Sequence, residues 1–264
     1  MLKTSLLVCT YNWPEALELV LKSILNQAQL PDEVLIVDDG STEDTKNLVA
    51  KYQSNFPVPL HHVWHPDDGF RKTIILNEAI AKAKGDYIIQ MDGDCVCHSS
   101  FVKDHIDFAS KGSFGQGSRV FMNPERSELA LQNFNFSIPF YSKGIVNRLN
   151  AIHAPFMRKM MDKPSTSLAG TRGCNVAFWK SDLIQVNGYN EAIQGWGRED
   201  TELAVRLMNS GISKRKLKFG AIQYHIHHED NSRGKLASNH GILETAIAEK
   251  WTRCEDGLNL HLEN

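Results

Sequence analysis

The chain has 264 residues, of which 42% are hydrophobic and 23% are charged. A chain of this length can bury a core without disulfides or a structural metal, and the composition excludes a disordered protein, a collagen and a coiled coil. The 29 basic and 31 acidic side chains give a net charge of −2. This near-neutral balance argues against nucleic acid as a partner, because proteins that bind the phosphate backbone carry a basic excess.

Residues 4–92 alternate short apolar runs with segments of helical periodicity. Strands are expected at 6–9, 34–37, 60–64 and 87–91, and helices at 15–27, 43–53 and 72–84. Apolar strands that alternate with helices predict a parallel sheet covered on both faces. Ligands bind such sheets at the carboxyl ends of the strands, where this sequence places the polar clusters 10–12, 38–41 and 92–94.

The second half of the chain is less regular. Strands are expected at 115–122, 174–179 and 219–227, helices at 199–209 and 240–252, and interrupted helices within 125–163. The sequence contains no internal repeat, low-complexity tract or linker-like stretch. We therefore predict a single compact α/β domain over residues 1–264.

The cysteines and the basic residues indicate the compartment. The five cysteines are dispersed and include no C-x-x-C pair, which favours reduced thiols in a cytoplasmic protein. No apolar run reaches the roughly 18 residues of a membrane span, and Met1–Ser5 lacks the features of a secretory signal. The basic run Lys214–Lys218 is expected to be a solvated turn. Its alternative is peripheral contact with acidic lipid at the inner face of the membrane.

Two clusters carry metal-binding side chains. Asp92-Gly93-Asp94 follows a buried strand, where two carboxylates can approach one cation and Gly93 permits a tight bend. The alternative is a plain acidic turn. His225, His227 and His228 end a later strand, and a strand period of two places His225 and His227 on one face. Imidazole with carboxylate suits manganese or a similar cation, whereas the alternative is a solvated strand end.

Two further clusters stand at helix starts. Glu199 and Asp200 follow Gly195-Trp196-Gly197-Arg198, where a carboxylate beside an aromatic ring could act as a general base. The alternative is that both carboxylates only complement the helix dipole. Arg71-Lys72 opens another helix, and its basic side chains would either meet phosphates or form a surface charge pair.

Taken in chain order, several short sequence blocks resemble glycosyltransferase family 2. Its nucleotide-binding half is resembled by the blocks 8–12, 37–41, 69–71 with 76–79, and 92–94. Its acceptor half is resembled by the blocks 174–191 and 195–200. The region 174–200 is also similar to the C-terminal segment of β-1,4-galactosyltransferases and of chondroitin polymerase domains. The resemblance to family 2 covers about residues 3–230 and is poorest at 122–170. It implies a GT-A fold with a nucleotide-sugar half at about 1–115 and an acceptor half at about 116–264.

The resemblance implies an inverting transferase that moves a hexose or N-acetylhexosamine from a UDP-sugar to a glycan or glycolipid hydroxyl. Carried over by position, Thr10 and Tyr11 would border the uracil and Asp38 would accept from its ring N–H. Arg71 would support that pocket. The expected products are surface polysaccharide or lipopolysaccharide.

The same resemblance implies a divalent cation, manganese or magnesium. Asp92, with Gly93 beside it, would contact the ribose or the cation, and Asp94 and His225 would ligate the cation. On the acceptor side, Asp200 would be the general base, Glu199 would hold an acceptor or donor hydroxyl, and Trp196 would wall the sugar site.

Two other functions compete with this interpretation. A nucleotidyltransferase usually carries a Gly-rich basic loop after its first strand, where this chain has Thr10–Pro14. A non-catalytic binding module would be favoured by loss of Asp94 or Asp200, and both are present. The absence of a Q-x-x-R-W motif and of a membrane span argues against a processive polysaccharide synthase.

Overall fold

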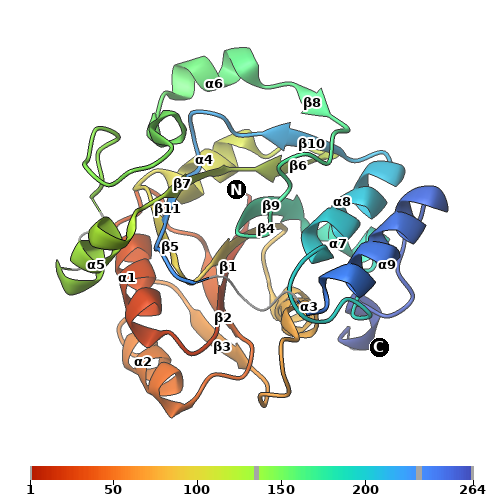
Figure 1. Cartoon of the computed structure of the whole chain (residues 1–264), viewed down its shortest axis with the longest axis horizontal. Coiled ribbons are helices and arrows are strands. Elements are labelled where there is room, and N and C mark those ends of the chain that lie inside the picture. The colour runs from red at the N-terminus through yellow and green to blue at the C-terminus, as the bar shows by residue number, and fades with distance from the viewer. Residues whose placement is uncertain (1, 134–136, 230–233, 263–264) are drawn as a thin grey trace.

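Four parallel strands from the first half of the chain form the centre of the molecule (Figure 1). The computed structural model describes residues 2–133, 137–229 and 234–262. The strands are β1 (Thr4–Thr10), β2 (Glu33–Asp38), β3 (Leu60–Trp64) and β4 (Tyr87–Asp92). Every residue of β1 and β2 is buried, as expected of strands covered on both faces. The four expected strands are confirmed.

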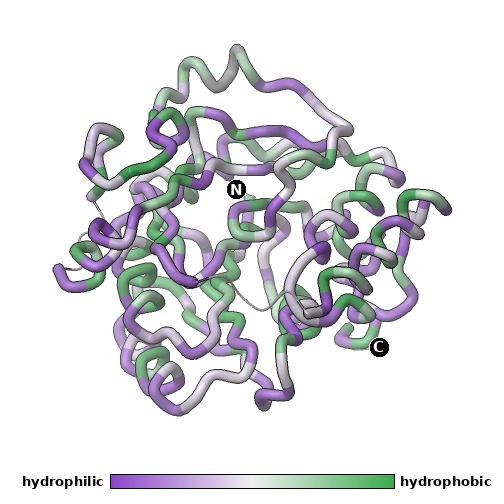
Figure 2. Tube along the Cα trace, viewed as in Figure 1, coloured by the Kyte–Doolittle hydropathy of each residue, from purple (hydrophilic) through white to green (hydrophobic). Residues whose placement is uncertain are grey.

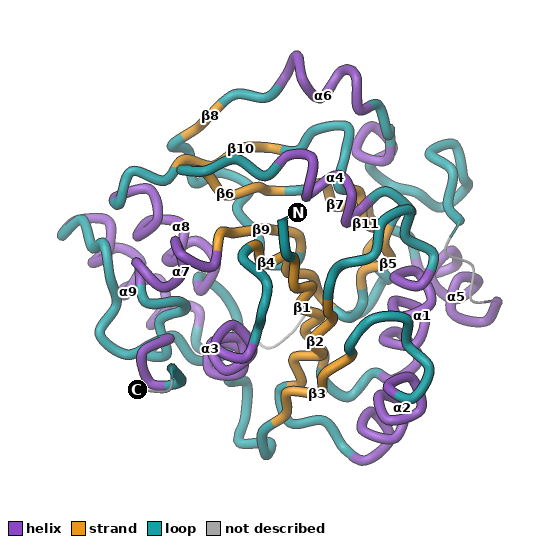
Figure 3. The backbone as a smooth tube through the Cα atoms, turned by 180° about the vertical axis from the view of Figure 1, so that it is seen from behind, coloured by secondary structure: helices purple, strands orange, loops and turns teal. Residues whose placement is uncertain are grey.

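Helices pack on both faces of this sheet, as Figures 1 and 3 show from opposite sides. One face carries α1 (Pro14–Leu25), α2 (Glu43–Gln53) and α4 (Phe101–Phe108). The other carries α3 (Lys72–Lys82), α7 (Lys180–Val186) and α8 (Glu199–Asn209). Leu17 and Val20 of α1 share a buried core with Leu6 and Val8 of β1, so helical spacing correctly identified the face that packs on the sheet.

The sheet continues into the second half of the chain. β9 (Asn175–Trp179) pairs antiparallel with β4, and beyond it lie β6 (Ser113–Gln116), β10 (Ser213–Lys216) and β8 (Pro164–Ser165). The strand order is β3-β2-β1-β4-β9-β6-β10-β8. One mostly parallel sheet flanked by helices therefore joins both halves in a single domain, as predicted.

A second, smaller sheet lies beside the carboxyl end of β4. It contains β5 (Cys95–Cys97), β11 (Ile222–His225) and β7 (Ser118–Phe121), with β11 in the middle. The single strand expected at 115–122 is therefore wrong, because the chain leaves one sheet at Gln116 and enters the other at Ser118. Gly117 allows the change of direction, since a side chain there would collide with Asn175.

The basic run 214–218 is only in part the expected solvated turn, because its first three residues belong to β10. Lys214 lies in β10 and is fully buried, with its ammonium donating to the carbonyl of Ala169 (2.9 Å) and the hydroxyl of Thr171 (3.1 Å). Burial lowers the pKa of Lys214 to about 8. Arg215 is paired with Asp162. Lys216 and Lys218 of the same run are exposed. Contacts within the fold therefore engage Lys214 and Arg215 and leave the other two cations facing solvent.

The remaining helices lie around the edges of the two sheets. They are α5 (Pro124–Asn133), the 3₁₀ turn η1 (Arg148–Ala151), α6 (Pro155–Met161), α9 (Leu236–Ala248) and the 3₁₀ turn η2 (Leu258–Leu260). Interrupted helices in 125–163 are thus confirmed, and α9 begins and ends four residues before the expected 240–252. Among the described residues, no helix is long and apolar enough to cross a membrane. All five cysteines are buried and unpaired.

Candidate active site

The carboxyl ends of β1, β2 and β4 meet at one edge of the sheet. The N–H of Gly93 donates to the carbonyl of Cys9 (2.6 Å), and the N–H of Asp39 donates to the carbonyl of Thr10 (3.1 Å). A Cβ at Gly93 would lie 2.9 Å from the Cys9 carbonyl oxygen, closer than real Cβ contacts. The glycine of the Asp-Gly-Asp motif is therefore required by this close approach of two strand ends.

Tyr11 and Arg71 stand on either side of an acidic loop at this edge. Tyr11 is half exposed, and its hydroxyl donates to Asp67 (2.9 Å). The Arg71 guanidinium donates to the carbonyl of Pro66 (2.6 Å) and lies 3.4 Å from the carboxylate of Asp68. The Arg71 backbone N–H donates to the carboxylate of Asp39 (3.0 Å). Tyr11 and Arg71, two of the side chains expected at the pocket for the base, thus lie against the same acidic loop.

The predicted contact between Asp38 and the base does not fit this structure. Asp38 is fully buried, and its two carboxylate oxygens are held by the N–H of Ser41 (2.9 Å) and by Nε2 of His62 (2.8 Å). Adjacent side chains on a strand point to opposite faces, so Asp38 points into the fold and Asp39 does not share its direction. Asp39 accepts from His65 (2.7 Å) and from the Arg71 N–H, and is the carboxylate that lies beside the pocket.

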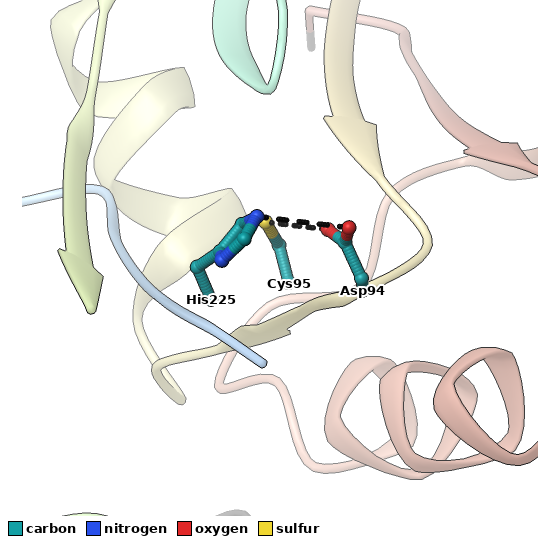
Figure 4. A group of neighbouring side chains, drawn as sticks. All are labelled: Asp94, Cys95 and His225. Atoms are coloured by element: carbon teal, nitrogen blue, oxygen red, sulfur yellow. Dashed lines mark hydrogen bonds and ion pairs between the residues drawn. The ribbon is translucent and has the colours of Figure 1, made fainter. Parts of the chain in front are cut away.

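A metal-ligating cluster forms where β5 and β11 meet. Oδ2 of Asp94 lies 3.7 Å from Nε2 of His225 and 3.2 Å from Nε2 of His228, and Sγ of Cys95 lies 3.2 Å from Oδ1 of Asp94. Asp94, Cys95 and His225 point toward one another from neighbouring strands (Figure 4). The N–H of Ile226 donates to the Asp94 carbonyl (2.9 Å) and locks the two segments together.

Within the histidine cluster, the expected partner of His225 was wrong. His227 is exposed, and its backbone N–H donates to the Ser127 hydroxyl (2.8 Å). His228 takes the place beside His225, with ring centroids 5.0 Å apart. The period of two failed because β11 ends at His225 and the chain beyond it is no longer a strand.

The donor atoms of this cluster fit one divalent cation. Ligands about 2.1 Å from a metal and at right angles lie roughly 3 Å apart. The distances from Asp94 Oδ2 to Nε2 of His228 (3.2 Å) and of His225 (3.7 Å) are close to that value, and the ligand atoms of Asp94, Cys95 and His225 all lie within 4.8 Å of one another. Burial lowers the pKa of His225, which leaves the imidazole neutral and able to ligate at neutral pH. Burial tends to raise the pKa of Asp94, but the hydrogen bond from His228 and the charge of His225 outweigh it and hold that pKa low.

The loop before α8 approaches the sheet edge from the acceptor side. The N–H of Gly195 donates to the carbonyl of Phe70 (3.0 Å), and the side-chain amide of Asn239 donates to the carbonyls of Gln194 and Gly197 (3.0 Å each). Gly195 and Gly197 both have positive φ, which lets the loop turn and leaves Trp196 partly exposed.

The first two residues of α8 are carboxylates with unpartnered oxygens. Oε2 of Glu199 and Oδ1 of Asp200 are both buried and accept no hydrogen bond from the described residues. Gly173 packs so closely against Asp200 that a side chain there would collide with Oδ1. Burial raises the pKa of both carboxyl groups, and the neighbouring charge of Asp200 raises that of Glu199 further. Buried polar atoms without partners are costly, so this arrangement suits a ligand hydroxyl.

Lys72, for which the sequence suggested phosphates or a surface charge pair, has a third role as the partly buried counterion of site carboxylates. Its ammonium lies 2.8 Å from Oδ1 of Asp92. Burial tends to lower the pKa of Lys72, but the negative charges of Asp92, Asp200 and Glu199 raise it well above its usual value. One cation thus offsets the charge of three carboxylates from both halves of the domain. The signal in the sequence was a lysine at the first position of a helix, where the dipole disfavours a positive charge.

The chain resembles known proteins, both in matches to family models and in matches to individual relatives. A family model described as glycosyl transferase family 2 matches residues 5–178, and one described as the N-terminal domain of galactosyltransferase matches residues 155–229. The chain is 27% identical over 240 residues to a hyaluronan synthase of Pasteurella multocida, and 24% identical over 242 residues to a chondroitin synthase of Escherichia coli. Each alignment covers 84% of this chain but only 24% and 34% of those relatives.

Solved structures share the arrangement of strands and helices. TarS of S. aureus superposes with a TM-score of 0.63 at 18% identity, covering 94% of this chain and 41% of that one. GalNAc-T7, solved with UDP, GalNAc and Mn2+, superposes with a TM-score of 0.68 at 15% identity, covering 93% and 48%. At such identities the likeness concerns the fold.

Proposed function

Because the chain belongs to glycosyltransferase family 2 and has the GT-A fold, we propose that it transfers a hexose or N-acetylhexosamine from a UDP-sugar to a glycan or glycolipid hydroxyl. The observation that carries the proposal is the pair of buried, unpartnered oxygens on Glu199 and Asp200. They belong to the acceptor half, and Lys72 links their charge to Asp92 at the end of β4. A nucleotide-binding module alone would not need them.

On the donor side, Thr10, Tyr11 and Arg71 would enclose the uracil, with Asp39 in place of Asp38 as the acceptor for its ring N–H. Asp39 supports this role because its carboxylate accepts from the backbone N–H of Arg71, at the end of the loop whose Asp67 accepts from Tyr11. Uracil carries a ring N–H donor that cytosine lacks, so a carboxylate acceptor favours UDP over CDP.

Asp94, His225 and His228 would hold a divalent cation, with Asp92 and Gly93 completing the edge next to them. Solved neighbours with Mn2+ and either UDP with GalNAc or GDP-Man support manganese as the ion. When bound, such an ion supplies positive charge that stabilises the diphosphate leaving group.

On the acceptor side, Asp200 would remove the proton from the attacking hydroxyl, and Glu199 would hold an acceptor or donor-sugar hydroxyl against the wall formed by Trp196. Attack from the face opposite the departing diphosphate proceeds without a covalent intermediate and inverts the anomeric carbon. An α-linked donor would therefore give a β-glycoside. The unpaired cysteines support a reducing, cytoplasmic compartment.

A panel of UDP-, GDP- and CDP-sugars, scored by thermal shift with and without manganese, tests the donor class. A UDP-sugar should raise the melting temperature only when manganese is present. The product formed with a glycan acceptor should carry a β-linkage by NMR. Release of pyrophosphate instead of UDP would indicate a nucleotidyltransferase and refute the proposal.

A further inference from the structure

The chain contains a long stretch that is free of acidic residues. Between Glu128 and Asp162 there is no Asp or Glu, although acidic residues outnumber basic ones in the chain as a whole. The same stretch carries four basic residues, namely Lys143, Arg148, Arg158 and Lys159. Its described part after α5, residues 137–161, is called the basic-apolar segment below.

This segment exposes an unusual amount of apolar surface. The four most exposed large apolar side chains among the described residues all belong to it: Phe156 (82%), Leu149 (78%), Tyr141 (70%) and Val146 (69%). Phe140 is half exposed beside Tyr141, with the two rings in contact. Single exposed apolar residues are ordinary, but a group of them in one short segment marks an interaction surface.

The backbone of the segment is held firmly, so the exposed side chains are displayed by an ordered scaffold. Ile145 forms a β-bridge with Met122, and the N–H of Val146 donates to the carbonyl of Phe121 (3.0 Å). Ile145 and Ala151 are residues of the segment whose side chains are buried against the small sheet and its surroundings. One side of the segment thus packs on the small sheet while the other faces outward along the edge of the molecule (Figures 1 and 2).

The attachment point lies next to the candidate metal site. The N–H of Met122 donates to the carbonyl of His225 (3.2 Å), and the ring of Phe121 packs edge-on against His225. A partner surface that binds the basic-apolar segment would therefore lie near the candidate metal site, where the acceptor would meet the donor sugar.

The charges indicate what that surface is. Lys143 and Arg148 are exposed, and neither forms an ion pair with a described residue. Aromatic and aliphatic side chains beside unpaired cations, without acidic residues, are the composition of segments that lie in the interface of an anionic bilayer. A two-fold contact of this segment with the same segment of a second copy would bring these cations against one another, which is unfavourable.

We propose that the basic-apolar segment docks this domain on an anionic lipid surface. Phe140, Tyr141, Leu149 and Phe156 would enter the interface, and Lys143 and Arg148 would lie against lipid phosphates. The surface is separate from the run 214–218, of which Lys214 and Arg215 are engaged within the fold. The inference goes beyond the proposed reaction and does not depend on it.

Sedimentation with vesicles tests the proposal, using phosphatidylcholine alone or mixed with phosphatidylglycerol. The wild-type chain should bind the mixed vesicles and release them as salt rises. The double variant Lys143→Gln/Arg148→Gln should bind them about tenfold to thirtyfold more weakly, since each basic residue near the surface contributes about fivefold. Leu149→Ser/Phe156→Ser should bind at least about tenfold more weakly.

Matched controls remove equivalent groups elsewhere. Lys46→Gln/Lys82→Gln removes two exposed cations, and Ile247→Ser/Leu260→Ser removes two exposed apolar side chains, so both should bind like the wild type. Binding of UDP with manganese should be unchanged in all four variants, which separates this test from that of the reaction.

Three results would overturn the proposal. The first is equal binding to both kinds of vesicle, or none. The second is a dimer in light scattering that Leu149→Ser/Phe156→Ser dissociates without any effect on vesicles, which would make a second copy the occupant. The third is a raised KM for a soluble glycan acceptor in that variant with normal vesicle binding, which would make the segment a glycan groove.

Discussion

Replacing Asp200 by Asn separates a catalytic carboxylate from one that only stabilises a helix start. The variant keeps the size of the side chain but removes its negative charge and its ability to take a proton. If Asp200 is the general base, the transfer rate should fall by about 10²–10⁴. Binding of the UDP-sugar should hardly change, because the proposed nucleotide contacts lie at the ends of β1 and β2 and in the Arg71 loop.

The two roles also predict opposite changes in stability. Burial raises the pKa of Asp200, so the folded state disfavours the ionised form. When the pKa of a carboxyl group is higher in the folded state than in the unfolded state, ionising the group destabilises the fold. The free energy of unfolding therefore falls as the pH rises from the unfolded pKa to the folded pKa, and it stays lowered at neutral pH. The Asn variant does not titrate there, so its melting temperature at neutral pH should match or exceed that of the wild type.

A purely helix-stabilising carboxylate would behave differently. Its loss would cost about 0.3–1 kcal/mol, or up to about 4 °C in melting temperature for a chain of this size, with no effect on rate. α2 offers a matched control because it also begins with a Glu-Asp pair, Glu43-Asp44, and both are exposed. Asp44→Asn should lower stability slightly and leave transfer unchanged.

The assay is direct. Initial rates of UDP release, donor affinity by calorimetry and melting temperature by calorimetry are measured on Asp200→Asn, Asp44→Asn and the wild type. A variant of Asp200 that melts lower and transfers sugar at the wild-type rate would refute the base assignment. One that retains its fold and donor affinity but loses at least about a hundredfold in rate agrees with it.

Three other predictions, with five substitutions between them, test the rest of the site. Asp94→Ala should abolish manganese-dependent UDP binding in calorimetry while His227→Ala preserves it, and a reversal would reject the chosen ligands. Lys72→Met should cost about 1–3 kcal/mol in urea unfolding, because it leaves Asp92 unpaired in a partly buried pair, and unchanged stability would contradict that pairing. Asp39→Asn should reduce the preference for UDP over CDP by about tenfold to a hundredfold, whereas Asp38→Asn should lower stability with that preference intact; the opposite outcome would restore Asp38 as the base contact.

Local patterns in the sequence determined most of the fold. The runs at 6–9, 34–37 and 87–91 are apolar on both faces apart from Gln90. Only a strand covered on both sides buries such a run, so the parallel sheet was predictable. The ligand edge followed from the same logic, because carboxyl ends of parallel strands lie together. The positions of Asp94, Glu199 and Asp200 at strand and helix ends were therefore also accessible from the sequence.

Only the tertiary structure determined which way individual side chains point and where a strand ends. Asp38 does not face the pocket because its carboxylate is hydrogen-bonded to the N–H of Ser41 and to His62. Neither partner belongs to the strand that carries Asp38, so local periodicity does not reveal these contacts. His228 replaced His227 because β11 stops at His225, a boundary set by its pairing with β5 and β7 rather than by its own residues.

The same holds for the charged side chains. Lys214 reads as solvated in the sequence but is buried because β10 pairs with β6 on one side and β8 on the other. The sequence pattern suggested phosphate contact or a surface charge pair for Lys72, yet Lys72 is the counterion of carboxylates from distant segments. A side chain's electrostatic role depends on the distances to charges far along the chain, and only the packed fold sets those distances.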